Sequence, residues 1–396
     1  MEKLYLSESW LIWILYLLYS LTCYFLFILF FSKFFNSDKK LIILYTLLYF
    51  FYSLIPLADF FIDMVPYFPD TNHYSIYVQG EMDQVDDLGY KTTMATYSFL
   101  GYFAFQEPFV FLNFQILFYF LSSCFIYKAW VLYTGKYDVG AHRLFLVLYF
   151  LYPSMLLFIP TTLRESLFTL AFSVLMYSLF LKNNKYRLIP QLLSFATLLL
   201  FRKQLAILTG LYIIGFYTLK KMNLLVRVAT ILTSFFVITR AMLFIGVTPG
   251  FISGIRMWLI NKYKHTGMTY GEVQWESYFD IVRSIPQLSL QFLLVPLPIA
   301  TDINPLQFKA LLIDLCFIIV IVFFFIISKA HRKHVFWTLF IVSLIVFPAG
   351  YEFAFPGAAR HRIPAILLMI PAAAAGLYQF KFLGRYKLYF GRSIST

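Results

Sequence analysis

The stretch Trp10–Phe31, WLIWILYLLYSLTCYFLFILFF, decides the fold of this chain. It contains no charged residue and, as a helix, is long enough to cross the roughly 30 Å hydrocarbon core of a bilayer. In lipid the backbone N–H and C=O groups must be paired within the segment, and a helix does this. The run is continuous and does not alternate, which favours a helix over a barrel strand. The sequence therefore predicts an all-α, polytopic integral membrane protein.

The composition of the whole chain supports the same class. Of its 396 residues, 61% are hydrophobic and only 13% are charged, whereas a soluble domain is about half apolar and about a quarter charged. A net charge of +13 in a soluble protein would suggest nucleic acid. In a membrane protein, Lys and Arg fix orientation and contact anionic lipid. We therefore expect the lipid bilayer as a partner and no nucleic acid.

Hydropathy predicts about eleven transmembrane helices. They cover residues 10–32, 41–62, 107–130, 144–160, 165–181, 187–201, 204–219, 225–245, 308–328, 335–350 and 363–380. The apolar stretch 284–300 carries three prolines and is expected to form an extra re-entrant or broken helix. We expect a single transmembrane domain over 1–396, with sizeable loops at 63–106 and 246–307.

Clusters of Lys and Arg predict the orientation of the spans. They lie at Lys33/Lys39/Lys40, Lys128/Lys136/Arg143, Lys182/Lys185/Arg187, Lys220/Lys221/Arg227, Lys329/Arg332/Lys333 and Lys381/Arg385/Lys387. Each cluster is two spans from the next if 284–300 does not cross, so all six share one face. This places the C-terminus in the cytoplasm and the N-terminus and both loops outside. If 284–300 crosses, one half of this map inverts.

Several ionisable residues fall in or beside the predicted spans, where a charge costs about 2.5–3.5 kcal/mol on insertion scales. They are Asp59, Arg164, Glu165, Arg202, Lys203, Arg240 and Asp314. The map puts five arginines at the outer face, namely Arg164, Arg202, Arg256, Arg360 and Arg362. Each one could reach lipid headgroups by itself, but five together favour an anion site, because the guanidinium fork pairs with phosphate oxygens. The natural anion at a membrane face is the phosphate or diphosphate of a lipid carrier.

The segment Pro356–Pro364, PGAARHRIP, strengthens this interpretation. Pro and Gly break a helix just before Arg360, His361 and Arg362, and Pro364 is tolerated in the first turn of the last span. The turn would hold the basic triplet at the positive end of a helix. The simpler alternative is an interfacial anchor.

The segment Phe68–Tyr74, FPDTNHY, is the candidate for chemistry. Asp70 lies in an outer loop just after a span and could act as a general base or hold a divalent ion. His73 is three residues away and could assist or exchange roles with it. The alternative is a solvated turn, since Pro-Asp is an ordinary turn signal. No residues show metal-ligand spacing.

These segments resemble a known class. Phe68–Tyr74 looks like the first-loop aspartate motif of membrane glycosyltransferases of the GT-C class. Gln106–Asn113, QEPFVFLN, is similar to a segment of bacterial polysaccharide polymerases of the Wzy and EpsG type. Tyr152–Met155 followed by Leu163–Phe168 resembles both groups, and 294–298 with 359–364 is closer to GT-C-like envelope proteins. Polymerase-type proteins often have a His near the position of Arg202, so the chain departs from them there.

The resemblance implies polysaccharide biosynthesis at the outer face of a bacterial inner membrane. A sugar or glycan would be transferred or polymerised from a polyprenyl-(di)phosphate-linked donor. Substrate binding would fall to Arg164, Glu165, Arg202, Arg256, Arg360, His361 and Arg362, which would stabilise the leaving phosphate. Asp70 would deprotonate the acceptor, assisted by His73. The resemblance leaves open whether a divalent cation takes part. Chain-length regulators or flippases are the implied protein partners.

Two other functions use the same residues. A transporter or flippase for a lipid-linked or anionic precursor would place charges near the midplane of the bilayer. Arg240 and Asp314 are the residues that favour it, while the absence of an internal sequence repeat and the gathering of charge at one face favour the enzyme. A non-catalytic assembly protein is the third hypothesis, and it predicts that Asp70→Asn and Arg164→Ala are tolerated.

Overall fold

The computed structural model describes residues 3, 6, 7, 9–35, 38–63, 65, 69–81, 88–181, 187–219, 222, 223, 226, 233, 240, 248–263, 269–297 and 305–390. Across this part of the chain the secondary structure is helical, apart from one isolated bridge between Thr269 and Ala354. The chain divides into two compact units. Unit 1 comprises 1–206, 321–333 and 367–396, and unit 2 comprises 207–320 and 334–366. We describe each unit by itself.

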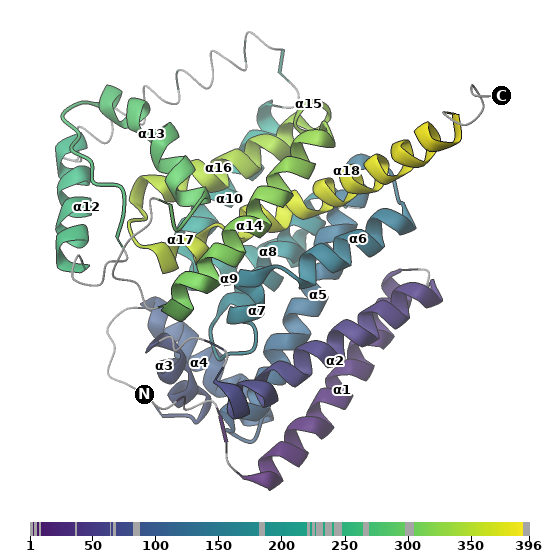
Figure 1. Ribbon diagram of the computed structural model, residues 1–396. Helices are drawn as coiled ribbons and strands as arrows, with labels where there is room; N and C mark the ends of the chain where they lie inside the picture. The colour runs from purple at the N-terminus through teal and green to yellow at the C-terminus, as the bar shows by residue number, and fades with distance from the viewer. Residues whose placement is uncertain are drawn as a thin grey trace. The chain divides into compact units, whose positions relative to one another are not determined.

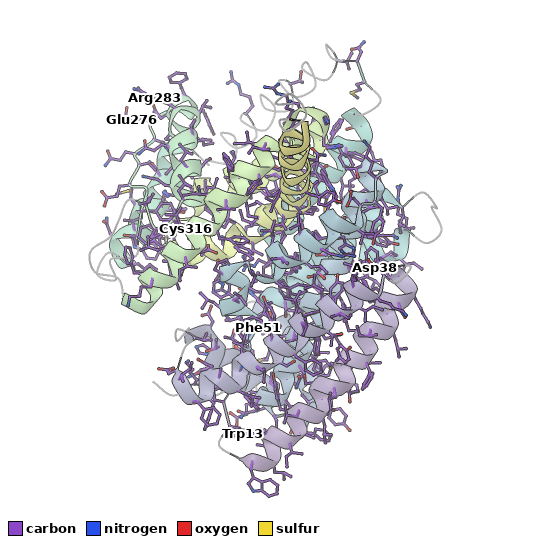
Figure 2. All side chains as sticks on the ribbon, turned by 45° about the vertical axis from the view of Figure 1, so that its right-hand side comes forward. Trp13, Asp38, Phe51, Glu276, Arg283 and Cys316 are labelled. Carbon is purple, nitrogen blue, oxygen red and sulfur yellow. The ribbon has the colours of Figure 1, made fainter. Side chains whose placement is uncertain are left out.

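Unit 1 begins with two long apolar helices, α1 (Trp10–Phe34) and α2 (Lys39–Ile62), which lie side by side (Figure 1). Asp38 caps α2 by accepting a hydrogen bond from the Lys40 backbone N–H at 2.9 Å, which satisfies a donor that the first turn leaves without a partner. Figure 2 shows Asp38 and Trp13 at opposite ends of this pair. Many apolar side chains on both helices are exposed, as expected where lipid covers the surface.

The helices α3 (Pro69–Val78), α4 (Leu88–Phe103), α6 (Val139–Phe150) and α8 (Glu165–Phe180) contact α5 (Pro108–Thr134), the most buried of the long helices. α9 (Leu188–Phe201) packs on α8 and α4, and unit 1 also contains α7 (Pro153–Phe158) and the short α15 (Ala330–Lys333). Pro108 occupies the first turn of α5, where no N–H is needed. Gly135 ends it in the left-handed conformation.

Unit 2 contains α12 (Pro249–Tyr263), α13 (Tyr278–Leu293), α16 (Val335–Tyr351) and α17 (Phe355–His361). It also holds residues 207–219 of α10 (Lys203–Leu219), 305–320 of α14 (Pro305–Ile327) and the first residues of α18 (Ile363–Phe390). α13 packs against α16 and α17. Its start is fixed by a capping box, in which Ser277 and Asp280 exchange side-chain and backbone hydrogen bonds.

Among the described residues, four helices are long and apolar enough to cross a membrane, or five if the pair α17–α18, bent by 50°, is one span. The four are α1, α2, α5 and the segment Phe308–Ile327 of α14. Four further apolar helices have 10–17 residues. The chain is therefore an all-α protein with membrane-spanning helices, while the predicted count of eleven is not confirmed. The span predicted over 225–245 lies almost entirely outside the described residues.

The structure corrects two expectations about individual segments. The span predicted over 144–160 is broken, because α6 ends at Phe150 and α7 begins only at Pro153, whose ring and missing N–H interrupt a helix. The loops predicted at 63–106 and 246–307 contain the helices α3, α4, α12 and α13. The apolar stretch starting at 284 belongs to α13, which begins earlier, at Tyr278, and ends at Leu293.

Candidate functional site

The predicted site residues fall into two groups, one in each unit. Unit 1 holds Asp70, His73, Arg164, Glu165 and Arg202, and unit 2 holds Arg256, Arg360, His361 and Arg362. Because the two units are described separately, each group is built here from its own contacts.

In unit 1 the aspartate motif docks on the segment that precedes α8. Thr162 Oγ1 donates to the backbone carbonyl of Thr71 at 2.7 Å. Ser75 Oγ donates to the same carbonyl at 2.8 Å and lies 3.1 Å from Thr162 Oγ1. Thr71, Ser75 and Thr162 are buried, while Asp70 and His73 occupy exposed positions of α3. Two motifs that lie about ninety residues apart in sequence therefore meet through hydrogen bonds.

Next to this contact lies a buried ion pair. Arg202 Nη2 is 3.2 Å from Glu165 Oε1, and the side chains are 8% and 0% exposed. The Arg202 guanidinium also lies over the ring of Phe168, 4.3 Å from its centroid. Glu165 lies in the first turn of α8 and Arg202 caps the C-terminus of α9. The negative charge is therefore at the positive end of its helix dipole and the positive charge at the negative end, and both placements are favourable. The structure thus brings together Glu165 and Arg202, which were predicted separately.

Arg164 differs from Arg202 in its surroundings. It occupies the N-cap position of α8 and is half-buried, whereas Arg202 is buried. Arg202, by contrast, already shares its charge with Glu165. Within unit 1, Arg164 is therefore the better placed of the two arginines to receive an anion.

The sequence did not single out Tyr97 and Gln115, which complete this group. Gln115 on α5 donates from Nε2 to the hydroxyl of Tyr97 on α4 at 3.0 Å. Burial and the nearby Tyr74 raise the pKa of Tyr97, Glu165 raises it further, and Arg164 opposes the rise. Tyr97 is thus close to both charged residues. The signal available in the sequence was an uncharged polar side chain, Gln115, inside an apolar run.

In unit 2, Arg256 is occupied by backbone carbonyls. It is 2% exposed, and its guanidinium donates to the carbonyl of Gly271 at 2.8 Å and to those of Ala349 and Gly350 at 3.3 and 3.2 Å. The last two belong to the final turn of α16, where carbonyls have no partner within the helix. Arg256 therefore holds a helix end, and its role as a phosphate ligand stays a prediction.

Arg362 is bound in a similar way. It is fully buried, pairs with Asp314 on α14, and donates from Nη1 to the carbonyls of Phe292 and Leu293 at 3.4 and 2.7 Å. Those carbonyls are at the C-terminus of α13. Asp314 was one of the two residues that favoured a transporter, and its place in an apolar helix is explained by this ion pair. The surroundings of Arg240 lie largely outside the described residues.

The remaining residues of the basic triplet lie beside another carboxylate. His361 Nδ1 is 2.9 Å from Glu352 Oε2, and Glu352 Oε1 accepts from the backbone N–H groups of Phe353 and Ala354 at 3.0 Å. A Cβ at Gly357 would lie 2.4 Å from Glu352 Oε1, so only glycine leaves room for the carboxylate. Arg360 is half-buried in the last turn of α17. The prediction that Pro356 and Gly357 break a helix before the triplet is wrong, because both lie in the first turn of α17, whose last turn holds Arg360 and His361. α18 begins at Ile363, so Pro364 lies in its first turn, as predicted.

Basic residues gather at one end of unit 1. Lys128 Nζ donates to the carbonyl of Phe34 at 3.4 Å, and Arg143 Nη2 lies 2.7 Å from Asp38 Oδ2. These contacts join the C-terminal ends of α1 and α5 to the N-terminal ends of α2 and α6. Tyr177 near the end of α8 packs on Phe34, with ring centroids 5.3 Å apart. We call this the basic end; its residues are Lys33, Lys39, Lys40, Lys128, Lys136 and Arg143.

Two more contacts bring α18 and the segment before α15 to the basic end. A Cβ at Gly140 would lie 2.2 Å from the ring of Tyr378, so α18 reaches the start of α6. Gly376 lies against Ser328, just before Lys329 and α15. Glu165 and Arg202 lie at the opposite end of unit 1, because α8 runs from Glu165 toward Tyr177. The charged group and the aspartate motif are therefore remote from the basic end.

The described residues contain no group of three or more His, Cys, Asp or Glu side chains that could hold a metal ion. The divalent cation that the resemblance left open stays untested. No family model, no curated protein and no solved structure matches the chain.

Proposed function

We propose that the chain is a membrane glycosyltransferase or polysaccharide polymerase that uses a polyprenyl-(di)phosphate-linked donor. The observation that supports this most directly is the hydrogen bond between Thr162 and the Thr71 carbonyl, 2.7 Å long. It holds a carboxylate-bearing helix against the segment that ends in Arg164. A base for an acceptor hydroxyl and a cation for a leaving phosphate are the two groups that glycosyl transfer from such a donor requires.

In this proposal the residues have separate roles. Asp70 takes the proton of the acceptor hydroxyl, and the hydroxyl oxygen attacks the anomeric carbon of the donor. The bond from that carbon to the phosphate oxygen breaks, and the phosphate leaves with the electron pair. Arg164 stabilises the charge that develops on the phosphate. Glu165 and Arg202 keep the start of α8 in place. His73 lies one turn from Asp70, is exposed as Asp70 is, and assists it.

The second group of basic residues receives a narrower role. Because Arg256 and Arg362 already donate to backbone carbonyls, they stabilise the ends of α16 and α13. Arg360 and His361 are half-buried at the bend between α17 and α18. If unit 2 contributes to donor binding, these two side chains are the ones we propose to contact it.

We also propose the finer topology of about eleven spans in a bacterial inner membrane, with the motifs facing outward. The gathering of Lys and Arg at one end of unit 1 supports it, since such residues are retained on the cytoplasmic side. Cysteine labelling tests it at two exposed positions, Glu276 and Lys136. Glu276→Cys should react with an impermeant reagent from outside, and Lys136→Cys only after the cells are opened. The reverse pattern would contradict this orientation.

The activity is tested by complementing a host strain that lacks the gene. We expect Asp70→Asn and Arg164→Ala each to reduce surface polysaccharide by about 100-fold or more, the range for loss of a general base or an oxyanion ligand. The matched controls are Asp38→Asn and Arg143→Ala, a part-exposed ion pair at the basic end. Normal polysaccharide in both test variants, with normal amounts of protein in the membrane, would reject the enzyme.

A further inference from the structure

The interface between α5 and α8 contains polar atoms that the protein itself does not satisfy. Gln115 Oε1, Ser166 Oγ and Thr169 Oγ1 are buried and have no hydrogen-bond partner in the described structure. All three residues are at most 1% exposed. A buried polar atom without a partner costs about 1–3 kcal/mol. We call these three residues the polar seam.

Helix geometry places the three residues of the polar seam together. α5 and α8 both run toward the basic end, where Phe125 packs on Tyr177 and Tyr133 packs on Phe180, with ring centroids 5.4 and 5.0 Å apart. Ser166 precedes Tyr177 by eleven residues and Thr169 precedes Phe180 by eleven, close to three turns. Ser166 and Thr169 therefore face α5, as Tyr177 and Phe180 do.

The same reasoning applies to α5. Gln115 precedes Tyr133 by eighteen residues, which is five turns, so it lies on the face of α5 that meets α8. It stands ten residues before Phe125, and Ser166 stands eleven before Tyr177. With a rise of 1.5 Å per residue, Gln115 and Ser166 differ in height by about 2 Å when counted from Phe125 and Tyr177, and by about 6 Å when counted from Tyr133 and Phe180. Ser166 and Thr169 lie in the first turns of α8 beside Glu165, and Gln115 lies on the facing side of α5 toward the same end.

The chemistry of the atoms limits what can fill the polar seam. Gln115 Nε2 is engaged by Tyr97, so Oε1 requires a donor. A phosphate or carboxylate oxygen accepts and cannot meet that need. The hydroxyls of Ser166 and Thr169 both donate and accept. A group that donates and accepts, such as an alcohol hydroxyl, satisfies all three.

We propose that the polar seam binds hydroxyl groups of the substrate's glycan, beside Arg164 at the start of the same helix. This inference rests on the proposed function and deepens it, because it separates the residues that recognise the sugar from the residue that holds the phosphate. Thr169 and its neighbours act as specificity-determining residues for the glycan.

Two probes that differ in the sugar test this on the full-length protein in detergent. One is bare undecaprenyl diphosphate and the other is the lipid-linked glycan extracted from the host. Apparent Kd is measured by titrating each probe against thermal unfolding. We expect Thr169→Val to weaken binding of the glycan-linked probe about three- to tenfold, the effect of one lost hydrogen bond. Binding of the bare diphosphate should not change, and Thr169→Ser should restore the glycan effect.

Ser173→Ala is the matched control, because Ser173 lies one turn further along α8 and its hydroxyl already donates to the Thr169 carbonyl at 2.7 Å. It should affect neither probe. Without ligand, Thr169→Val should unfold at the same temperature as the wild type or higher, since it removes a hydroxyl that has no partner. If Thr169→Val leaves the glycan-linked probe unaffected, the polar seam holds only water and the inference is wrong. Equal weakening of both probes would mean a structural role and would also overturn it. If the wild type binds neither probe, the proposed function itself fails.

Discussion

Replacing Arg362 by Met would leave the buried Asp314 carboxylate without the guanidinium that faces it. Arg362 is fully buried, and the Asp314 side chain is 2% exposed. Removing one partner of such a pair costs about 3–5 kcal/mol. The variant also loses the bonds to the carbonyls of Phe292 and Leu293, each worth about 1.5 kcal/mol with a charged donor. Because these contributions overlap, we expect the free energy of unfolding to fall by about 5 kcal/mol.

A second substitution separates the charge from the carbonyl bonds. Arg362→Met combined with Asp314→Leu removes both charges, so only the loss at the end of α13 remains. The double variant should recover about 2–3 kcal/mol relative to the single variant, a coupling energy usual for residues in one network. Arg283→Met is the matched control, because Arg283 is an exposed arginine on α13 (Figure 2). It should change stability by no more than about 0.5 kcal/mol.

The assay is unfolding in mixed micelles by titration with SDS, followed by tryptophan fluorescence. Trp337 is fully buried in unit 2 and should report the loss of its packing. A loss below about 1 kcal/mol for Arg362→Met, or a double variant no more stable than the single one, would refute the structural role that we assign to Arg362. The arginine would then be available to a ligand, as the sequence had suggested.

Two further predictions concern unit 2 and its turns. Gly271 has φ +72°, and a Cβ there would lie 2.4 Å from Arg256 Nη2. Gly271→Ala should therefore lower the free energy of unfolding by more than the roughly 1–2 kcal/mol of left-handed strain alone. Gly135→Ala is the control, with φ +68° and no atom within 4 Å, and equal losses for the two variants would contradict the clash. Hydrogen bonds from the backbone and side chain of Ser277 lower the pKa of Asp280. The contribution of Asp280 to the free energy of unfolding should therefore be present above about pH 4 and be lost as the pH falls through the lowered pKa. The stability difference between wild type and Asp280→Asn should shrink on acidification, and a difference independent of pH would count against the capping box.

Long apolar helices were predictable from the sequence because their signal is local. The bounds of α1, α2, α5 and α14 agree with the predicted spans to within a few residues. The helices α3 and α12, by contrast, are short and only partly apolar, so hydropathy assigned them to loops. Docking through Thr71 and Thr162 fixes α3 in place, and no pattern within residues 63–106 contains that information.

The candidate site was predictable as a set of residues but not as an arrangement. A charge in an apolar run is conspicuous, so Arg164, Glu165 and Arg202 were identified from their cost to the membrane. The pairing of Glu165 with Arg202 depends on two helices returning to the same end of unit 1. Gln115 and Tyr97 were missed because uncharged polar residues are common in spans.

The sequence by itself determined that the bilayer organises this chain and which of its charges are costly. Both follow from transfer free energies that each residue contributes locally. Only the tertiary structure decided what those charges do, because a guanidinium can meet a phosphate, a carboxylate or the carbonyls at the end of a helix. Arg256 and Arg362 meet carbonyls, Arg202 meets Glu165, and Arg164 stays half-buried at the N-cap of α8. Those outcomes depend on contacts between residues far apart in sequence, which only the folded chain brings together.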